Sequence, residues 1–169
     1  MKKKDRYKYL LDYFQNEMPR VSTELEYGSA YQLLVAVILS AQCTDKRVNM
    51  ITPVLFERYP DAKSMADAEP DEVYEYVKSV SYPNAKARYL VDMSRMLMTE
   101  YSGEVPQSMG DLLKLPGVGR KTANVMQAVA FGRSAIAVDT HVFRVSHRLG
   151  LVPKSCDTPL KVERELVRN

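Results

Sequence analysis

The chain has 169 residues, of which 46% are hydrophobic, enough to bury one ordinary core or two small ones. Its 24 Lys and Arg side chains against 21 Asp and Glu give a net charge of +3, which suits nucleic acid but is shared by many proteins without that partner. The longest apolar run, residues 33–39, is far shorter than the roughly 20 residues that cross a bilayer. Acidic residues interrupt the N-terminal lysines, so no export signal is predicted and we expect a cytoplasmic protein.

The two cysteines, Cys43 and Cys156, are far apart in the chain and do not form a C-x-x-C pair. This spacing predicts two reduced thiols. It favours neither a disulfide framework nor a metal knuckle.

Apolar residues recur at helical spacing over most of the chain. The predicted helices span residues 6–18, 29–42, 44–59, 61–68, 70–80, 84–101, 109–115, 119–131 and 139–149, with a last one from 159 onward. The second is apolar nearly all round, which indicates a buried central helix. In the third, Val48, Val54 and Leu55 are among the residues expected to face inward. With no repeat and no convincing strand pair, the sequence predicts an all-α fold.

A glycine hairpin separates two of these helices, at residues 115–123. Pro116 ends the preceding helix, because its ring excludes the residue before it from the α region. Gly117 and Gly119 allow a positive φ or a close approach of the backbone to another surface. We expect the amides of Gly117, Val118 and Gly119 to face outward at the start of the next helix, whose dipole attracts an anion such as phosphate. This arrangement suits the binding of a nucleic-acid backbone without reading its sequence.

Lys121 follows the hairpin by two residues, in the first turn of the next helix. The positive end of the helix dipole and the neighbouring Arg120 both disfavour its ammonium form. A partly neutral lysine can attack an electrophilic sugar carbon and form a Schiff base. The position also suits an ordinary phosphate-binding cation, and the spacing alone leaves both interpretations open.

Asp139 stands directly before another predicted helix. Its simplest role is that of an N-cap, which keeps the carboxylate ionised. An ionised carboxylate near a reacting sugar also stabilises positive charge at the anomeric carbon and accepts a proton from Lys121. The two roles are compatible, because one oxygen can cap the helix while the other faces the substrate.

Four motifs carry a resemblance to a known family: L-S-A-Q-x-T-D at 39–45, N-x-K-A at 84–87, L-P-G-V-G-x-K-T-A at 115–123 and V-D-T-H at 138–141. The chain resembles the endonuclease III branch of the helix-hairpin-helix base-excision DNA glycosylases. The resemblance implies two helical lobes around a cleft, with Lys121 as the nucleophile and Asp139 as the essential carboxylate. A lysine in the hairpin helix implies an enzyme that removes a base and also cleaves the strand. Oxidised pyrimidines are the substrate class that the resemblance implies.

The resemblance also assigns residues to the space that an extruded nucleotide leaves. Gln42 matches an inserting glutamine, although a glutamine at a helix end can instead bond its own loop. Tyr82 matches the position of an apolar wedge, where many relatives have leucine, and Ser81 stands where they have glycine. A tyrosine here can stack on exposed bases or serve as a core aromatic.

Further assignments concern the grip on DNA. The hairpin amides and Arg120 are assigned to the phosphate backbone of damaged or abasic double-stranded DNA. His141 is a candidate phosphate or base contact, or equally a packed or capping histidine. The carbonyls of Leu113, Leu115 and Val118 resemble those that hold a monovalent cation in DNA-bound hairpins. We expect a monomer that associates with the nucleoid and has no membrane partner.

The expected domains are a six-helix lobe at 20–134, with the helix-hairpin-helix at 109–131, and a partial second lobe from 1–19 and 135–169. The last helix has no stop signal before Asn169, so we expect a C-terminally shortened chain with an incomplete second lobe.

Most of the family carries a 4Fe–4S cluster on four cysteines spaced C-x6-C-x2-C-x5-C, C-terminal to everything in this chain. Neither Cys43 nor Cys156 corresponds to them, so we expect no cofactor ligands within this chain.

One alternative from a different class is a non-catalytic helix-hairpin-helix DNA-binding module. In that case Lys121 is a phosphate contact and Asp139 a helix cap. A third interpretation, an all-α protein-interaction domain, leaves the glycine hairpin to coincidence.

Overall fold

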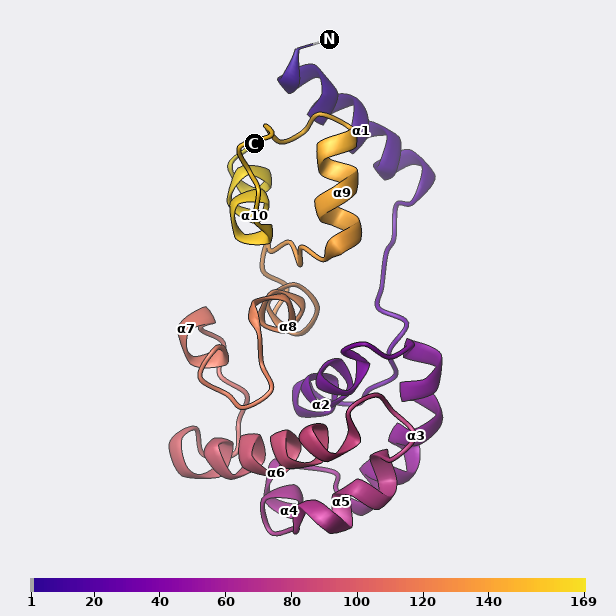
Figure 1. Cartoon of the computed structure of the whole chain (residues 1–169), viewed down its shortest axis with the longest axis vertical. Coiled ribbons are helices and arrows are strands. Elements are labelled where there is room, and N and C mark those ends of the chain that lie inside the picture. Colours follow the sequence, from indigo (N-terminus) through magenta and orange to yellow (C-terminus); the bar gives the residue numbers. More distant parts are fainter. Residues whose placement is uncertain (1) are drawn as a thin grey trace. The chain divides into compact units, whose positions relative to one another are not determined.

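The structure is a computed structural model that describes residues 2–169, and every regular element in this range is helical (Figure 1). The α-helices are α1 (Lys3–Glu17), α2 (Ala30–Ser40), α3 (Asp45–Arg58), α4 (Ala62–Ala66), α5 (Pro70–Val77), α6 (Pro83–Glu100), α7 (Met109–Leu112), α8 (Arg120–Val125), α9 (Thr140–Arg148) and α10 (Pro159–Arg168). A π-helix, Met126–Ala130, follows α8 directly. The predicted all-α fold is confirmed. Within residues 2–169, none of the helices combines the length and apolar character that a membrane span requires.

The chain divides into two compact units. The terminal unit combines Met1–Ser22 with Ser134–Asn169, and the hairpin unit is the continuous stretch Thr23–Arg133. Helices α2 to α8 therefore belong to the hairpin unit, and α1, α9 and α10 to the terminal unit.

Helix α2 forms the centre of the hairpin unit. All seven residues from 33 to 39 are buried, and the helix contacts α3, α6, α8 and the π-helix. Ser29 caps its N-terminus by accepting a hydrogen bond from the Gln32 amide at 3.1 Å. The prediction of a buried central helix is confirmed, although the helix ends at Ser40 rather than at residue 42.

Helix α3 begins after Thr44, whose hydroxyl accepts from the Arg47 amide at 3.3 Å. Its buried residues are Val48, Thr52 and Leu55. The expectation that Val54 faces inward is wrong, since 56% of this residue is exposed. Val54 is six residues from Val48, about 240° around the helix, so it lies off the buried face.

The helix after the hairpin differs from the single element predicted over 119–131. It ends at Val125 and continues as the π-helix, in which the Phe131 amide bonds the Met126 carbonyl at 3.2 Å. Gly132 then ends it with φ +61°, as a C-terminal glycine does. A π-turn inside a helix commonly marks a functional region.

The terminal unit has a small core. Its cluster of buried hydrophobic residues consists of Val138, Val152, Cys156 and Val162. Helix α1 contributes no buried residue, and on the face where its apolar residues were predicted, 64% of Leu11 and 49% of Phe14 are exposed.

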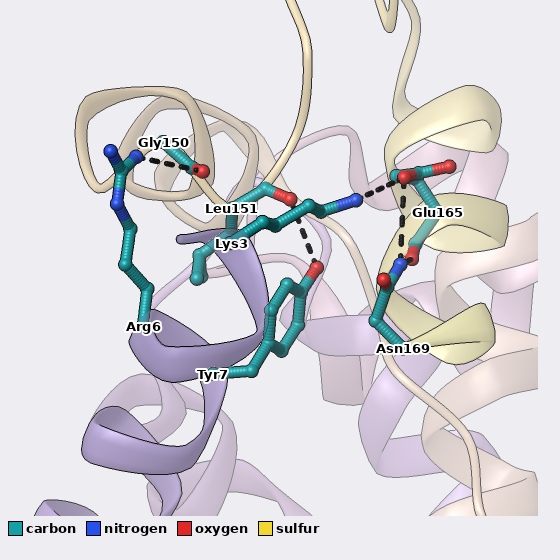
Figure 2. Close-up of polar contacts among 7 residues, drawn as sticks. All are labelled: Lys3, Arg6, Tyr7, Gly150, Leu151, Glu165 and Asn169. Carbon is teal, nitrogen blue, oxygen red and sulfur yellow. Dashed lines mark hydrogen bonds and ion pairs between the residues drawn. The ribbon is translucent and has the colours of Figure 1, made fainter. Parts of the chain in front are cut away.

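Polar contacts attach α1 within this unit (Figure 2). Arg6 donates from Nη1 to the Gly150 carbonyl at 3.2 Å. The Tyr7 hydroxyl donates to the Leu151 carbonyl at 3.0 Å, and burial raises the pKa of this phenol. Lys3 forms an ion pair with Glu165 of α10. These bonds hold the first two turns of α1.

Candidate active site and DNA-binding loops

The glycine hairpin begins where α7 ends, at Leu112, three residues earlier than predicted. Gly117 has φ +78°, and a Cβ on it would lie 2.9 Å from the Cβ of Tyr89 on α6. Gly119 has φ −90° and open space where a Cβ would lie. The fold therefore requires glycine at 117, whereas at 119 the missing side chain only leaves the approach to the hairpin open.

One hairpin amide has a different role from the one predicted. The Val118 amide donates to the Leu115 carbonyl at 3.1 Å and so closes the turn. The Val118 side chain is 8% exposed and belongs to the core of the hairpin unit. The expectation that this amide faces an anion is wrong, because the turn itself needs the donor. The amides of Gly117 and Gly119 remain predicted phosphate contacts.

A hydrogen-bonded carboxylate fixes the entrance to the hairpin. Ser108 caps α7 by accepting from the Asp111 amide at 3.0 Å. The Asp111 carboxylate in turn accepts from Lys114 Nζ at 2.8 Å and from the Ser108 hydroxyl at 2.6 Å. These donors, Lys114 first, lower the pKa of Asp111 to about 2. The carboxylate is therefore ionised at neutral pH and keeps α7 in place.

Lys121 lines a pocket of about 310 Å³ within the hairpin unit. It is exposed and lies in the first turn of α8. Gln42 and Asp45 line the same pocket, together with apolar Leu25 and Val37. The fold thus brings two predicted site residues, Gln42 and Lys121, to one concave surface. Asp45 was named above only as the last residue of the L-S-A-Q-x-T-D motif, and its place in the same pocket as Lys121 depends on the packing of α2, α3 and α8.

The two predicted inserting residues have an unusual backbone. Gln42 has φ +55° and Tyr82 has φ +54°, in the left-handed region that residues with a side chain rarely adopt. Both side chains are exposed, Tyr82 to 72%. The exposure rules out the core-aromatic interpretation of Tyr82. The Ser81 hydroxyl donates to the Gln42 carbonyl at 2.5 Å and joins the two loops.

In the terminal unit, Asp139 is the N-cap of α9, as predicted. Its Oδ1 accepts from the amides of His141 and Val142 at 2.9 and 2.8 Å. The His141 side chain is exposed, with Nδ1 3.5 Å from Arg144 Nη2. A packed histidine is therefore excluded at this position.

The cysteines do not fit the iron–sulfur cluster that the resemblance implies for the family. Cys43 follows α2 in the hairpin unit, and Cys156 precedes α10 in the terminal unit. Within residues 2–169, no three His, Cys, Asp or Glu side chains are grouped so that they could share a metal ion.

Sequence comparisons relate this chain to endonuclease III enzymes. Endonuclease III of Synechocystis is 48% identical over 167 residues, which cover 98% of this chain and 75% of that protein. Endonuclease III of Bacillus subtilis is 44% identical, over 95% of this chain and 73% of its own length. Endonuclease III of Escherichia coli is 41% identical, over 85% of this chain and 68% of its own length.

Solved structures of endonuclease III also match this chain. A trapped covalent intermediate of endonuclease III with DNA and a non-covalent complex each match with a TM-score of 0.91 and 43% identity, over 99% of this chain and 78% of theirs. Residues 35–169 match the HhH-GPD superfamily of base excision DNA repair proteins. The chain therefore belongs to this superfamily and is an endonuclease III homologue, a base-excision DNA glycosylase and AP lyase.

Proposed function

We propose that Lys121 is the nucleophile of this glycosylase and that its substrates are oxidised pyrimidines in double-stranded DNA. The lysine amine attacks the anomeric carbon of the damaged nucleotide, and the base leaves with the electrons of the glycosidic bond and takes up a proton. The nitrogen, having lost a proton, then forms the C=N bond of the Schiff base as the C1′–O4′ bond breaks and O4′ is protonated to a hydroxyl. Loss of a proton from C2′ then breaks the bond to the 3′ phosphate. The position of Lys121 carries this proposal: it follows the hairpin directly and lines a pocket with Gln42.

Asp139 is proposed to stabilise the positive charge that develops on the sugar and to accept a proton from the attacking lysine. The cap uses Oδ1 for both of its hydrogen bonds. These two bonds fix the direction of the carboxylate, so the cap and the catalytic role support each other.

The DNA grip is proposed to combine three surfaces. Gly119 and Arg120 approach the phosphate backbone, because no side chain covers the hairpin at 119. Gln42 and Tyr82 enter the duplex where the nucleotide has been extruded. His141 contacts DNA from the start of α9, where its side chain is exposed. A monovalent cation on the hairpin carbonyls of the DNA complex and a monomeric enzyme remain part of this proposal.

Borohydride trapping on a duplex with one abasic site tests the nucleophile. The wild-type chain is expected to form a covalent adduct, and Lys121→Gln none, because an amide cannot form the Schiff base. Duplex binding by Lys121→Gln, measured by fluorescence anisotropy, should remain. An adduct of wild-type yield with Lys121→Gln would reject the assignment.

Asp139→Asn separates the cap from the chemistry, since Asn caps a helix about as well as Asp. We expect an unchanged melting temperature and a loss of about 10²–10³-fold in excision of an oxidised pyrimidine, as for removal of one preorganised electrostatic group. Single-turnover excision assays measure this. Equal stability with undiminished excision would leave Asp139 as a cap alone, as in the non-catalytic alternative.

A further inference from the structure

Lys86 is a buried lysine to which sequence reasoning assigned no role beyond membership of the N-x-K-A motif. It lies near the start of α6 and is 4% exposed. Its Nζ donates to the Leu39 carbonyl at 2.8 Å and to the Ala41 carbonyl at 2.5 Å. Burial lowers the pKa of this amine. A buried ammonium is unfavourable unless it is hydrogen-bonded, so these two bonds justify its position.

The acceptors of Lys86 lie at the end of α2. The last carbonyls of a helix have no partner within the helix, and a cation there also interacts favourably with the helix dipole. Ala41 directly precedes Gln42, and the Gln42 carbonyl accepts from Ser81. The backbone on both sides of the Gln42 side chain is therefore held by donors from residues 81–86, a stretch that also contains Tyr82.

The strained backbone makes this attachment important. Gln42 and Tyr82 both have φ near +55°, at +55° and +54°. Such conformations persist where the surrounding structure imposes them, and they concentrate at functional sites. Both side chains point to solvent, so burial of the side chains does not explain the conformation. The Cys43 amide donates to the Ser40 carbonyl at 2.9 Å and closes a local turn around Gln42. The bonds from Ser81 and Lys86 attach this turn to the stretch that carries Tyr82.

We propose that Lys86 is a positioning residue that locks the Gln42 loop to the Tyr82 loop, so that the two side chains enter the duplex as one preformed unit. The inference rests on the proposed function, since it assumes that these side chains fill the space of an extruded nucleotide. Lys86 touches neither DNA nor the reacting sugar. It acts by fixing the main chain on which the inserting side chains are carried.

The test measures insertion without chemistry. Wild type and Lys86→Met are titrated onto a duplex with a stable abasic analogue opposite 2-aminopurine, whose fluorescence rises when it is unstacked. We expect the rise at saturating protein to be about fivefold smaller for Lys86→Met, because inserting groups displaced by about 1 Å lose most of their effect. Lys121→Gln should keep the full rise. A wild-type rise with folded Lys86→Met would overturn the proposal.

A second readout uses trapping on two substrates. Lys86→Met should form adduct about tenfold more slowly than wild type on a paired abasic duplex. It should be within about twofold of wild type when the abasic site lies in an unpaired bubble, where no stacked partner has to be displaced. An equal loss on both substrates would indicate a general structural role and overturn the proposal. Failure of wild type to trap on either substrate, with the fluorescence rise intact, would reject the Lys121 chemistry but not the positioning role.

Ser81→Ala provides a milder variant if Lys86→Met does not fold. It removes the other bond to the Gln42 loop from a half-buried position. We expect the same selective loss on the paired duplex, at about threefold. A double-mutant cycle with Gln42→Ala completes the test, because a positioning residue loses its effect once the side chain that it positions is gone. Multiplicative losses in the cycle would contradict the proposal.

Discussion

The two units of this protein are stabilised in different ways. The hairpin unit is built around α2, whose residues 33–39 are all buried. The cluster in the terminal unit has four buried hydrophobic members among the described residues, and α1 is attached by hydrogen bonds and an ion pair. Local opening is easier where few apolar contacts are buried. We therefore expect the terminal unit to open at a lower free energy than the hairpin unit.

The difference in core size between the two units corresponds to the kind of contact that holds the predicted site residues of each unit. Gln42 and Tyr82 are held by bonds between residues 39 to 47 positions apart in the chain, which need a rigid core to keep both ends in place. Asp139 is oriented by amides two and three residues further along. A local cap needs no large core. The weaker unit can thus carry a well-oriented carboxylate, while the residues that depend on long-range contacts lie in the stronger unit.

The largest expected loss of stability comes from a cavity in the core of the hairpin unit. Leu34→Ala, at a fully buried position of α2, should lower the free energy of unfolding by about 2–5 kcal/mol, because it leaves a cavity. The same change at Leu11, 64% exposed on α1, should alter it by less than about 0.5 kcal/mol. Urea unfolding followed by circular dichroism measures both. Comparable losses would mean that Leu11 is buried in solution and that the two units differ less than described.

The next largest loss of stability is expected from substitution of Gly117, with Gly119 in the same hairpin as its control. Gly117→Ala should cost at least about 1–2 kcal/mol, because alanine is strained at φ +78° and its Cβ meets Tyr89. Gly119→Ala has neither problem; it loses only the preference of the α8 N-cap position for glycine over alanine and should cost less than about 1 kcal/mol. If the backbone at 119 approaches phosphate, Gly119→Ala should instead weaken duplex binding, measured by anisotropy. Unchanged affinity would remove Gly119 from the proposed grip.

The smallest effect concerns the attachment of α1. Gly132 and Gly150 have φ +61° and +65°, so alanine is similarly strained at both. At Gly150 the new Cβ would also lie 1.9 Å from Arg6 Nη1, whereas at Gly132 it meets open space. Gly150→Ala should therefore cost about 0.5–1.5 kcal/mol more than Gly132→Ala, the value of a lost hydrogen bond. Hydrogen exchange should locate the additional loss of protection in α1. Equal protection of α1 in the two variants would show that the Arg6 bond does not hold this helix.

Local sequence was sufficient for features that depend on near neighbours. Asp139 was predicted as a helix N-cap because a cap is decided within a few positions of the chain. The hairpin glycine at 117 and the buried helix α2 were predicted for the same reason. The family motifs added the interpretation of Lys121, whose chemistry the spacing alone left open.

Tertiary structure decided the features whose partners are distant in sequence. The attachment of the Gln42 turn to the stretch that carries Tyr82 depends on donors from Ser81 and Lys86, about forty positions away, and no local pattern at residue 42 reveals it. The Val118 amide donates to the Leu115 carbonyl within the turn, so it does not face outward as predicted. Periodicity shows which residues prefer burial, but the packing of other helices decides which carbonyl, amide or ammonium finds a partner. That is why the sequence by itself identified the lysine and the hairpin, and the fold alone brought Lys86 to the loop that carries Gln42.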